Sequence, residues 1–380
     1  MSMRMHVPCG QGKFLRLPAA HVHRRFGNCH GVLQPISFKR TVRCLLLAPS
    51  FPLSTLFAQT TGPALSPTSI FSPVSTPANS IFGLSLFVIG VTAIIFVVVF
   101  SLLVYTVLRF RSRRDDDGRE PPQVYGSNQV ELAWTVIPIL IVVTLFMATA
   151  RVIAGIQEAV APADAVKVMA IGHQFWWEFR YPMLKVVTAN ELHVPVSDAN
   201  HPIPTLIKLL SADTNHSFWV PRLAGKTDLI PNRVNDTWID PHETGLYLGQ
   251  CAQYCGTQHA KMLLRVYVQT RDEFDRWVQE QVQPAHITDA DSRGRKIFET
   301  TACINCHTVA GTVADGRFGP DLTHLMSRET IGSGAALNTP ANLRLWIKNP
   351  GALKPGSKMP AMGLSDQEVN AVAEYLEALR

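Results

Sequence analysis

The chain has 380 residues, of which 47% are hydrophobic and 17% are charged. Soluble domains carry about 25% charged residues, so this composition excludes a disordered chain and indicates membrane-spanning segments. The formal net charge of +6 comes from residues 1–58, which hold eight basic and no acidic residues. The rest of the chain has 27 basic and 29 acidic residues, which gives no support for a nucleic-acid-binding function.

The basic extension at residues 1–58 ends in the pattern of a secretory signal peptide. In residues 41–58 an apolar run follows a basic stretch, and small residues near its end favour cleavage after Ala58. A short interfacial helix is the alternative interpretation of this run. Residues 59–80 are rich in Ser, Thr and Pro, which predicts a linker.

Two apolar segments predict a transmembrane helical hairpin over residues 81–151. Residues 81–108 and 132–150 contain no charged side chain. At about 1.5 Å per residue, both are long enough to span a hydrocarbon core of roughly 30 Å. A membrane helix tolerates Pro138 in the second segment, for which a buried soluble helix is the alternative.

Arginines in the loop between the two segments predict that this loop faces the cytoplasm. They are Arg109, Arg111, Arg113, Arg114 and Arg119. Both termini and the 230 residues from Arg151 onward are then expected on the periplasmic or extracytoplasmic side of a bacterial cell (inner) membrane.

Residues 162–270 contain short runs of β-forming residues separated by Pro, Asn, Asp and Gly. The predicted strands are 165–171, 191–196, 205–210, 237–240, 244–249 and 262–269. Short strands at this spacing are typical of an antiparallel sandwich or barrel.

The loop after the fifth of these strands carries Cys251, Cys255, His259 and Met262, and His216 lies upstream. Soft sulfur with imidazole selects copper or zinc, and a weak axial Met indicates an electron-transfer copper. Two cysteines allow both sulfurs to bridge two coppers. A disulfide, a zinc site of the two cysteines and two histidines, and a Met that only fills the core are the alternatives.

Residues 289–380 contain the motif of covalent haem c attachment. Cys303, Cys306 and His307 have the C-x-x-C-H spacing, in which two thiols bind the haem and the histidine binds the iron. A redox-active cysteine pair and half of a zinc site are the alternatives. The predicted sixth ligand is Met359, in a Pro/Gly-rich loop, because Met ligation raises the haem potential. Its competitors are Met362, Met326 and His324.

Residues 271–288 are expected to connect the two outer domains through a helix at 271–281 and a tether at 282–288. A capping box, Ser365 with Glu368, predicts a closing helix. Its apolar face is expected to pack against a first helix at 291–301. That face comprises Val369, Val372, Ala373, Leu376 and Leu379.

With these motifs the chain resembles subunit II of a haem–copper cytochrome c oxidase. The matching blocks are the Glu131-Leu-Ala-Trp-Thr start of the second helix, Gly172–Tyr181, His216–Pro221 and Cys251–Met262. The last domain resembles class I cytochromes c through Gly319–Leu322 and the Lys-Met-Pro run around Met359. The resemblance is to the caa3 type and implies a multidomain membrane protein. Its parts would be a two-helix transmembrane hairpin, a cupredoxin-like β-sandwich and an all-α cytochrome c domain.

The resemblance implies a two-copper centre, called CuA, in the sandwich. Cys251 and Cys255 would bridge the coppers, and His216 and His259 would each cap one metal. The weak ligands would be Met262 and the backbone carbonyl of Gln253. Family members commonly have Glu at position 253, which also helps to hold magnesium against subunit I. The neutral side chain here does not support that magnesium contact.

Two further roles are carried over from the family. Phe175 stands where many relatives have a Trp that receives electrons from soluble cytochrome c, and Trp176 and Trp177 follow it. Large aromatics in a β-rich domain are also typical of its core. Glu131 is implied near a proton-uptake path of subunit I, and its alternative is a carboxylate favoured by the helix dipole.

The implied function is electron transfer. An external cytochrome or other donor would reduce the haem c, which passes electrons to CuA and then to haem a in subunit I. Oxygen reduction and proton pumping occur in subunit I, with subunit III as a further partner, so no catalytic residue is assigned here. The alternative is a membrane-tethered copper or haem electron carrier without oxidase partners. A quinol-oxidase subunit is disfavoured because all five copper-binding side chains are present.

Overall fold

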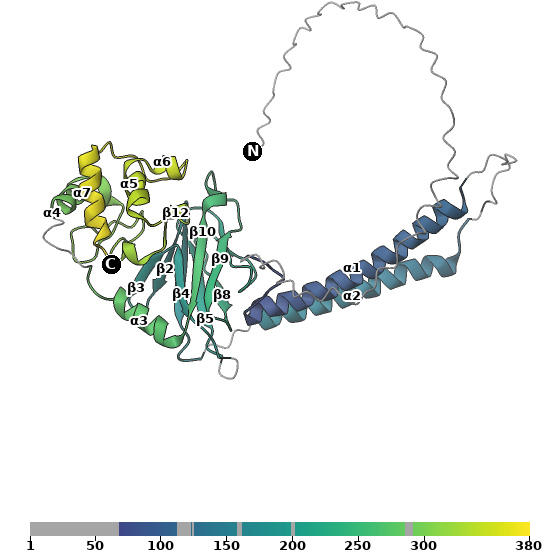
Figure 1. Cartoon of the computed structure of the whole chain (residues 1–380). Helices are drawn as coiled ribbons and strands as arrows, with labels where there is room; N and C mark the ends of the chain where they lie inside the picture. The colour runs from purple at the N-terminus through teal and green to yellow at the C-terminus, as the bar shows by residue number, and fades with distance from the viewer. Residues whose placement is uncertain (1–67, 112–122, 124, 158–161, 199–201, 286–291) are drawn as a thin grey trace, which may run out of the picture. The chain divides into compact units, whose positions relative to one another are not determined.

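The computed structural model describes residues 68–111, 123, 125–157, 162–198, 202–285 and 292–380 (Figure 1). All of them belong to one compact unit, residues 62–380. The predicted signal peptide lies outside the described residues. So do residues 59–67 of the predicted 59–80 linker, three of the five loop arginines and the end of the 282–288 tether. The last five residues of that predicted linker, 76–80, are helical instead, because the first membrane helix begins before its uninterrupted apolar run.

Two long helices confirm the predicted hairpin. Helix α1 (Thr76–Arg109) has 34 residues and α2 (Asn128–Gln157) has 30, and the two lie side by side (Figure 1). Pro138 lies inside α2. Large apolar side chains on both helices are exposed, for example Phe96 at 65% and Leu132 at 65%. Helices that are apolar on every side are stable in lipid, where they satisfy their own backbone hydrogen bonds.

The domain after the hairpin is a sandwich of two five-stranded sheets. The first has the order β3-β2-β1-β5-β8 and the second β4-β10-β9-β6-β7. The first contains β1 (Lys167–His173), β2 (Trp176–Tyr181), β3 (Val186–Ala189), β5 (Thr205–Ser211) and β8 (Asn235–Ile239). The second contains β4 (Glu191–Pro195), β6 (His216–Trp219), β7 (Thr227–Leu229), β9 (Gly245–Cys251) and β10 (Leu263–Gln269).

The predicted sandwich is confirmed, and its sheets are mixed rather than purely antiparallel. Strand β1 pairs with β5 in parallel, as β4 does with β10. The reason is the path of the chain, which leaves the first sheet through β4 and returns to it at β5, beside β1. Strands β2, β3, β6 and β7 were not predicted, because they are short or lie within the aromatic block.

Aromatic side chains fill the space between the sheets. Trp177, Phe179, Tyr181 and Phe218 are each fully buried. The predicted connecting helix is confirmed as α3 (Arg271–Gln281), which begins with a capping box. Its buried Phe274 and Trp277 pack against Tyr181, with ring centroids 6.4 and 5.4 Å away. Helix α3 therefore extends the sandwich core.

The C-terminal domain is mainly helical. Its helices are α4 (Ser292–Thr300), α5 (Pro340–Lys348), α6 (Pro350–Leu353) and α7 (Asp366–Glu377), and its two short strands are β11 (Thr330–Ile331) and β12 (Ala336–Leu337). The predicted capping box at Ser365 and Glu368 is present at the start of α7. The predicted apolar face of the closing helix is buried in the domain core.

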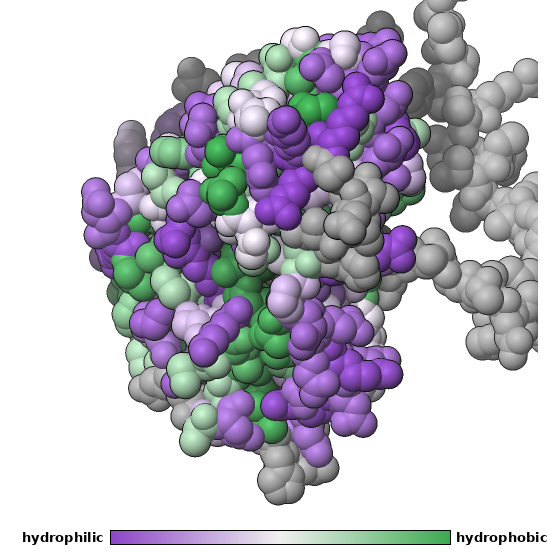
Figure 2. Space-filling view, turned by 90° about the vertical axis from the view of Figure 1, so that its left-hand side faces the viewer, coloured by the Kyte–Doolittle hydropathy of each residue, from purple (hydrophilic) through white to green (hydrophobic). Residues whose placement is uncertain are grey.

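The surface of the outer portion differs from that of the hairpin. Figure 2 views the molecule from the left-hand side of Figure 1, and polar residues cover much of this face, with apolar residues gathered in smaller patches. A surface of this kind suits water, whereas the exposed apolar side chains of α1 and α2 suit lipid.

The contact between α4 and α7 depends on Gly294. A Cβ at this position would lie 1.9 Å from the carbonyl oxygen of Ala371 and 2.9 Å from Cβ of Tyr375. Gly294→Ala should therefore destabilise the C-terminal domain by about 1–3 kcal/mol, the usual penalty of overpacking. Faster amide hydrogen exchange in α7 of the full chain would report the loss. Gly155→Ala is the control, because nothing lies within 4 Å of its added methyl group. Unchanged exchange in the Gly294 variant would contradict the prediction.

Candidate functional site

The loop from Cys251 to Met262, here called the cysteine loop, joins β9 to β10. The backbone N–H of Cys251 donates to the carbonyl of Met262 at 3.0 Å, which closes the base of the loop. A short 3-10 helix, η1 (His259–Lys261), precedes Met262. Cys251, Cys255 and Met262 are all buried. The pairing of β9 with β10 thus keeps three sulfur atoms buried at one end of the sandwich.

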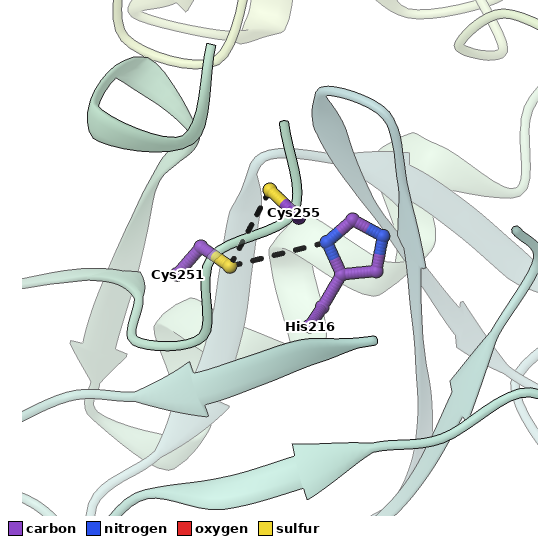
Figure 3. Close-up of side chains that lie close together, drawn as sticks. All are labelled: His216, Cys251 and Cys255. Atoms are coloured by element: carbon purple, nitrogen blue, oxygen red, sulfur yellow. Dashed lines mark hydrogen bonds between the residues drawn. The ribbon is translucent and has the colours of Figure 1, made fainter. Parts of the chain in front are cut away.

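One imidazole and two thiols converge at the start of this loop (Figure 3). Cys251 Sγ lies 3.9 Å from Cys255 Sγ and 3.9 Å from Nδ1 of His216. His216 begins β6, which pairs with β9 so that Phe218 is opposite Cys251. These three ligand atoms all lie within 4.8 Å of one another. The pairing of neighbouring strands brings together residues that are 35 positions apart.

The second thiol has its own nitrogen and sulfur neighbours. Cys255 Sγ lies 3.8 Å from Nδ1 of His259 and 3.8 Å from Sδ of Met262. The carbonyl oxygen of Gln253 is 3.1 Å from Cys251 Sγ. All six predicted donors are therefore gathered at this loop, and each thiol faces a different imidazole.

The donor set fits copper. Two thiols, two imidazoles and a thioether are soft or borderline ligands, which select copper or zinc over hard cations. The sulfurs of Cys251 and Cys255 are 3.9 Å apart and unbonded, so the structure has no disulfide here.

Asp213 orients His216 and was not recognised in the sequence. Its carboxylate bonds Nε2 of His216 at 2.8 Å and accepts the backbone N–H groups of Gln174 and Thr214. Burial opposes ionisation, but these donors lower the pKa of Asp213. Burial also lowers the pKa of His216, and the bonds to Asp213 and Cys251 outweigh it, so the net pKa is raised. A carboxylate on one ring nitrogen directs the other toward a metal. An Asp three residues before His216 was the available signal.

The two thiols have opposite acidities. The hydrogen bond between the two thiols lowers the pKa of Cys251 to about 3, with a further contribution from His216. The Cys251 sulfur in turn raises the pKa of Cys255. Because thiolates are the metal-binding form, a metal held by both sulfurs displaces any thiol proton that remains.

The predicted aromatic residues have three different environments. Phe175 is buried against Gly256 of the cysteine loop, where an added Cβ would lie 3.0 Å from its ring. Trp176 is partly exposed and stacks on His173 with ring centroids 4.2 Å apart. Trp177 is fully buried, and its Nε1–H donates to the carbonyl of Met262 at 3.4 Å. Phe175 and Trp177 therefore belong to the packing around the loop.

The C-x-x-C-H motif forms a tight turn in the C-terminal domain. Cys303 lies in the 3-10 helix η3 (Ala302–Asn305), and its carbonyl accepts the N–H groups of Cys306 and His307. Nδ1 of His307 donates to the carbonyl of Pro320 at 2.8 Å, which leaves Nε2 available to a metal. Desolvation lowers the pKa of His307, which favours the neutral, ligating form.

Two observations show that the surroundings of His307 fit a haem. An added Cβ at Gly319 would lie 2.6 Å from the His307 ring, so only glycine leaves room there. Arg328 is 7% exposed, and its Nε has no hydrogen-bond partner among the described residues. Its Nη2 donates to the carbonyl of Asp321 at 2.6 Å. The remaining donors of this buried guanidinium suit a carboxylate, and haem carries two of them.

The four candidates for the sixth ligand separate into two groups. His324 is buried, and its Nε2 bonds the carbonyl of Gln283 at 3.1 Å, which disfavours it as an iron ligand. Met326 packs against the domain core. Met359 and Met362 are partly buried, and the choice of Met359 stays a prediction.

Glu131 lies in the first turn of α2 and is exposed. Its backbone N–H donates to the carbonyl of Ser127 at 2.9 Å. This position agrees with a carboxylate favoured by a helix N-terminus. Its role near a proton path stays a prediction.

Three protein families match consecutive parts of the chain. Residues 67–151 match "Cytochrome C oxidase subunit II, transmembrane domain" and residues 166–269 match "Cytochrome C oxidase subunit II, periplasmic domain". Residues 292–380 match "Cytochrome c". The second match implies copper in the sandwich, and the third implies haem in the C-terminal domain.

Individual relatives agree. Cytochrome c oxidase subunit 2 of Alkalihalophilus pseudofirmus is 34% identical over 319 residues, which cover 81% of this chain and 90% of the relative. The same subunit of a Bacillus species is 31% identical over 290 residues, with coverages of 71% and 80%. The solved periplasmic domain of subunit II of cytochrome oxidase from Bradyrhizobium japonicum is 30% identical, with a TM-score of 0.30, and covers 32% of this chain and 96% of that one. The chain belongs to the cytochrome c oxidase subunit II family and carries a C-terminal cytochrome c domain.

Proposed function

We propose that the cysteine loop holds a dinuclear CuA centre in this oxidase subunit. The observation that carries the proposal is the pair of sulfurs 3.9 Å apart, each facing the Nδ1 of a different histidine. Cys251 and Cys255 would bridge, and His216 and His259 would be the terminal ligands. A pair of coppers supplies one-electron exchange with little change of geometry.

The weak ligands of this centre would come from the thioether of Met262 and the carbonyl of Gln253. Both groups lie within 4 Å of a bridging sulfur. The side chain of Gln253 is exposed and neutral, so its main chain alone is assigned a role. A magnesium contact is not proposed.

In the C-terminal domain, Cys303 and Cys306 would attach the haem covalently, and His307 and Met359 would be the axial ligands. The hydrogen bond from His307 to Pro320 supports the first axial ligand. The haem supplies one-electron exchange with an external donor. The protein fixes the ring orientation and keeps the imidazole neutral.

The proposed topology places both outer domains on the periplasmic side of a bacterial inner membrane. The arginine-rich loop between the two helices supports this orientation. Subunit I would accept electrons from the cysteine loop, subunit III would complete the assembly, and an external cytochrome would be the donor. Glu131, at the loop end of α2, would then lie on the cytoplasmic side, where proton uptake begins.

Metal analysis of the purified full chain tests the dinuclear assignment. We expect about two coppers per chain, because two thiolates and two imidazoles provide equivalent half-sites. One unpaired electron shared by two copper nuclei should appear in the EPR spectrum. One zinc per chain with no copper EPR signal would overturn the assignment.

Gly172 tests the position of His216. An added Cβ at Gly172 would lie 2.8 Å from Cδ2 of the imidazole, so Gly172→Ala should displace this ring. We expect copper to be lost to a competing chelator about 10–100-fold more readily, the usual effect of disturbing the support of a ligand. Lys167→Ala, at an exposed position of the same strand, is the control and should retain copper. Equal retention in both variants would contradict the role of Gly172.

Redox titration of the haem absorbance distinguishes the two remaining Met candidates. Met359→Leu should lower the haem reduction potential, because a Met ligand raises it. Met362→Leu should leave the potential unchanged. The reverse result would show that Met362 is the ligand.

A further inference from the structure

A buried lysine links the C-terminal domain to the sandwich. Lys354 follows α6 and is 3% exposed. Its Nζ donates to the carbonyl of Phe175 in the sandwich and to the carbonyl of Gly332 in its own domain, each at 2.8 Å. One ammonium group therefore joins the two domains beside the cysteine loop.

A buried carboxylate forms the second link. Glu191, the first residue of β4, is 1% exposed. It accepts the N–H groups of Glu329 and Thr330 at 3.1 and 2.9 Å, and the hydroxyl of Thr330 at 2.9 Å. The start of β11 is thus bound to the edge strand of the second sheet. Lys354 and Glu191 are together called the clamp below.

Further contacts surround the clamp. Leu263 and Ser333 exchange two hydrogen bonds, from the Leu263 N–H to the Ser333 carbonyl and from the Ser333 hydroxyl to the Leu263 carbonyl. Arg265 forms an ion pair with Glu329 at 2.8 Å. On the sandwich side, these contacts are made by Leu263 and Arg265 at the start of β10, directly after the cysteine loop.

The segment that leads to Met359 lies on the cysteine loop itself. The side-chain amide of Gln258 donates to the carbonyl of Pro355. Gly356 has φ +84°, and an added Cβ there would lie 3.0 Å from Oγ1 of Thr257. The candidate haem-ligand loop and the candidate copper loop are therefore in direct contact.

Buried charges make this arrangement specific. Burial lowers the pKa of Lys354 to about 7 and raises that of Glu191, which reflects how strongly each is desolvated. A buried charge is tolerated only where its hydrogen-bond partners are in place. Any other placement of the C-terminal domain would leave these two groups buried without partners or would expose them to water.

We propose that Lys354 and Glu191 are positioning residues that hold the C-terminal domain on the cysteine loop in one arrangement. Lys354 bonds the carbonyl of Phe175, whose side chain is 6% exposed, so an outside electron donor has little access to this candidate electron-entry residue. The electron-transfer part of this inference rests on the function proposed above.

Amide hydrogen exchange of the full, metal-loaded chain tests the clamp. Lys354→Met keeps a long apolar stem and removes the donors. The amides of Leu263, Glu329 and Thr330, which bond across the interface, should then exchange about tenfold faster or more. Lys354→Arg should restore part of the protection. Lys296→Met, at an exposed site of α4, is the control and should match the wild type. Wild-type protection in Lys354→Met would overturn the proposal.

The rate of electron transfer from haem to copper is the second readout. After rapid photoreduction of the haem, the first-order rate should fall about tenfold or more in Lys354→Met, because donor and acceptor are no longer held in one geometry. The haem spectrum and potential should stay unchanged. A wild-type rate in a variant with faster amide exchange would also overturn the proposal. Absence of copper or haem from the wild-type chain would contradict the proposed function. The amide exchange would still test whether Lys354 and Glu191 hold the C-terminal domain in place.

Discussion

The position of Cys251 at the end of β9 is the constraint on which the candidate metal site depends. Three interactions fix it. The ladder places Cys251 opposite Phe218, which brings in His216 from β6. The Cys251 N–H bonds the Met262 carbonyl, so the loop returns to its starting point. Trp177, from the other sheet, donates to that same carbonyl. A dry, closely packed scaffold of this kind keeps the ligand atoms in place before any metal binds.

The two candidate metal sites use the same physical solution on unrelated scaffolds. In each, one nitrogen of an imidazole is held by an oxygen acceptor, Asp213 for His216 and the Pro320 carbonyl for His307. In each, a glycine also lies against the ring, Gly172 or Gly319, where a methyl group would overlap it. The acceptor selects the ring nitrogen that faces the metal, and the glycine sets how closely the ring can approach the glycine's backbone. Orientation and clearance are thus controlled separately.

Features encoded within a few residues of one another were predictable. The capping box of α7, the C-x-x-C-H turn and the two apolar helices depend on local spacing or periodicity, and the structure contains them all. The partners of the metal-binding residues were less accessible. Asp213 lies only three residues before His216, but it also accepts the N–H of Gln174, 39 positions away. Lys354 contacts a carbonyl 179 positions away. The parallel pairing of β1 with β5 likewise follows from the exchange of the chain between sheets. Such contacts depend on tertiary structure, which short-range patterns do not encode.

The covalent connection between the outer domains explains how a polar interface can hold them together. Two free domains with a dissociation constant of about 10 μM gain only about 7 kcal/mol on binding. Linked through a short segment, they experience an effective concentration of about 1 mM, so the same interface is occupied about 99% of the time. The contacts at Glu191 and Lys354 therefore do not need to supply high affinity. Their buried charges instead exclude incorrect arrangements, which is the property that electron transfer between two fixed centres requires.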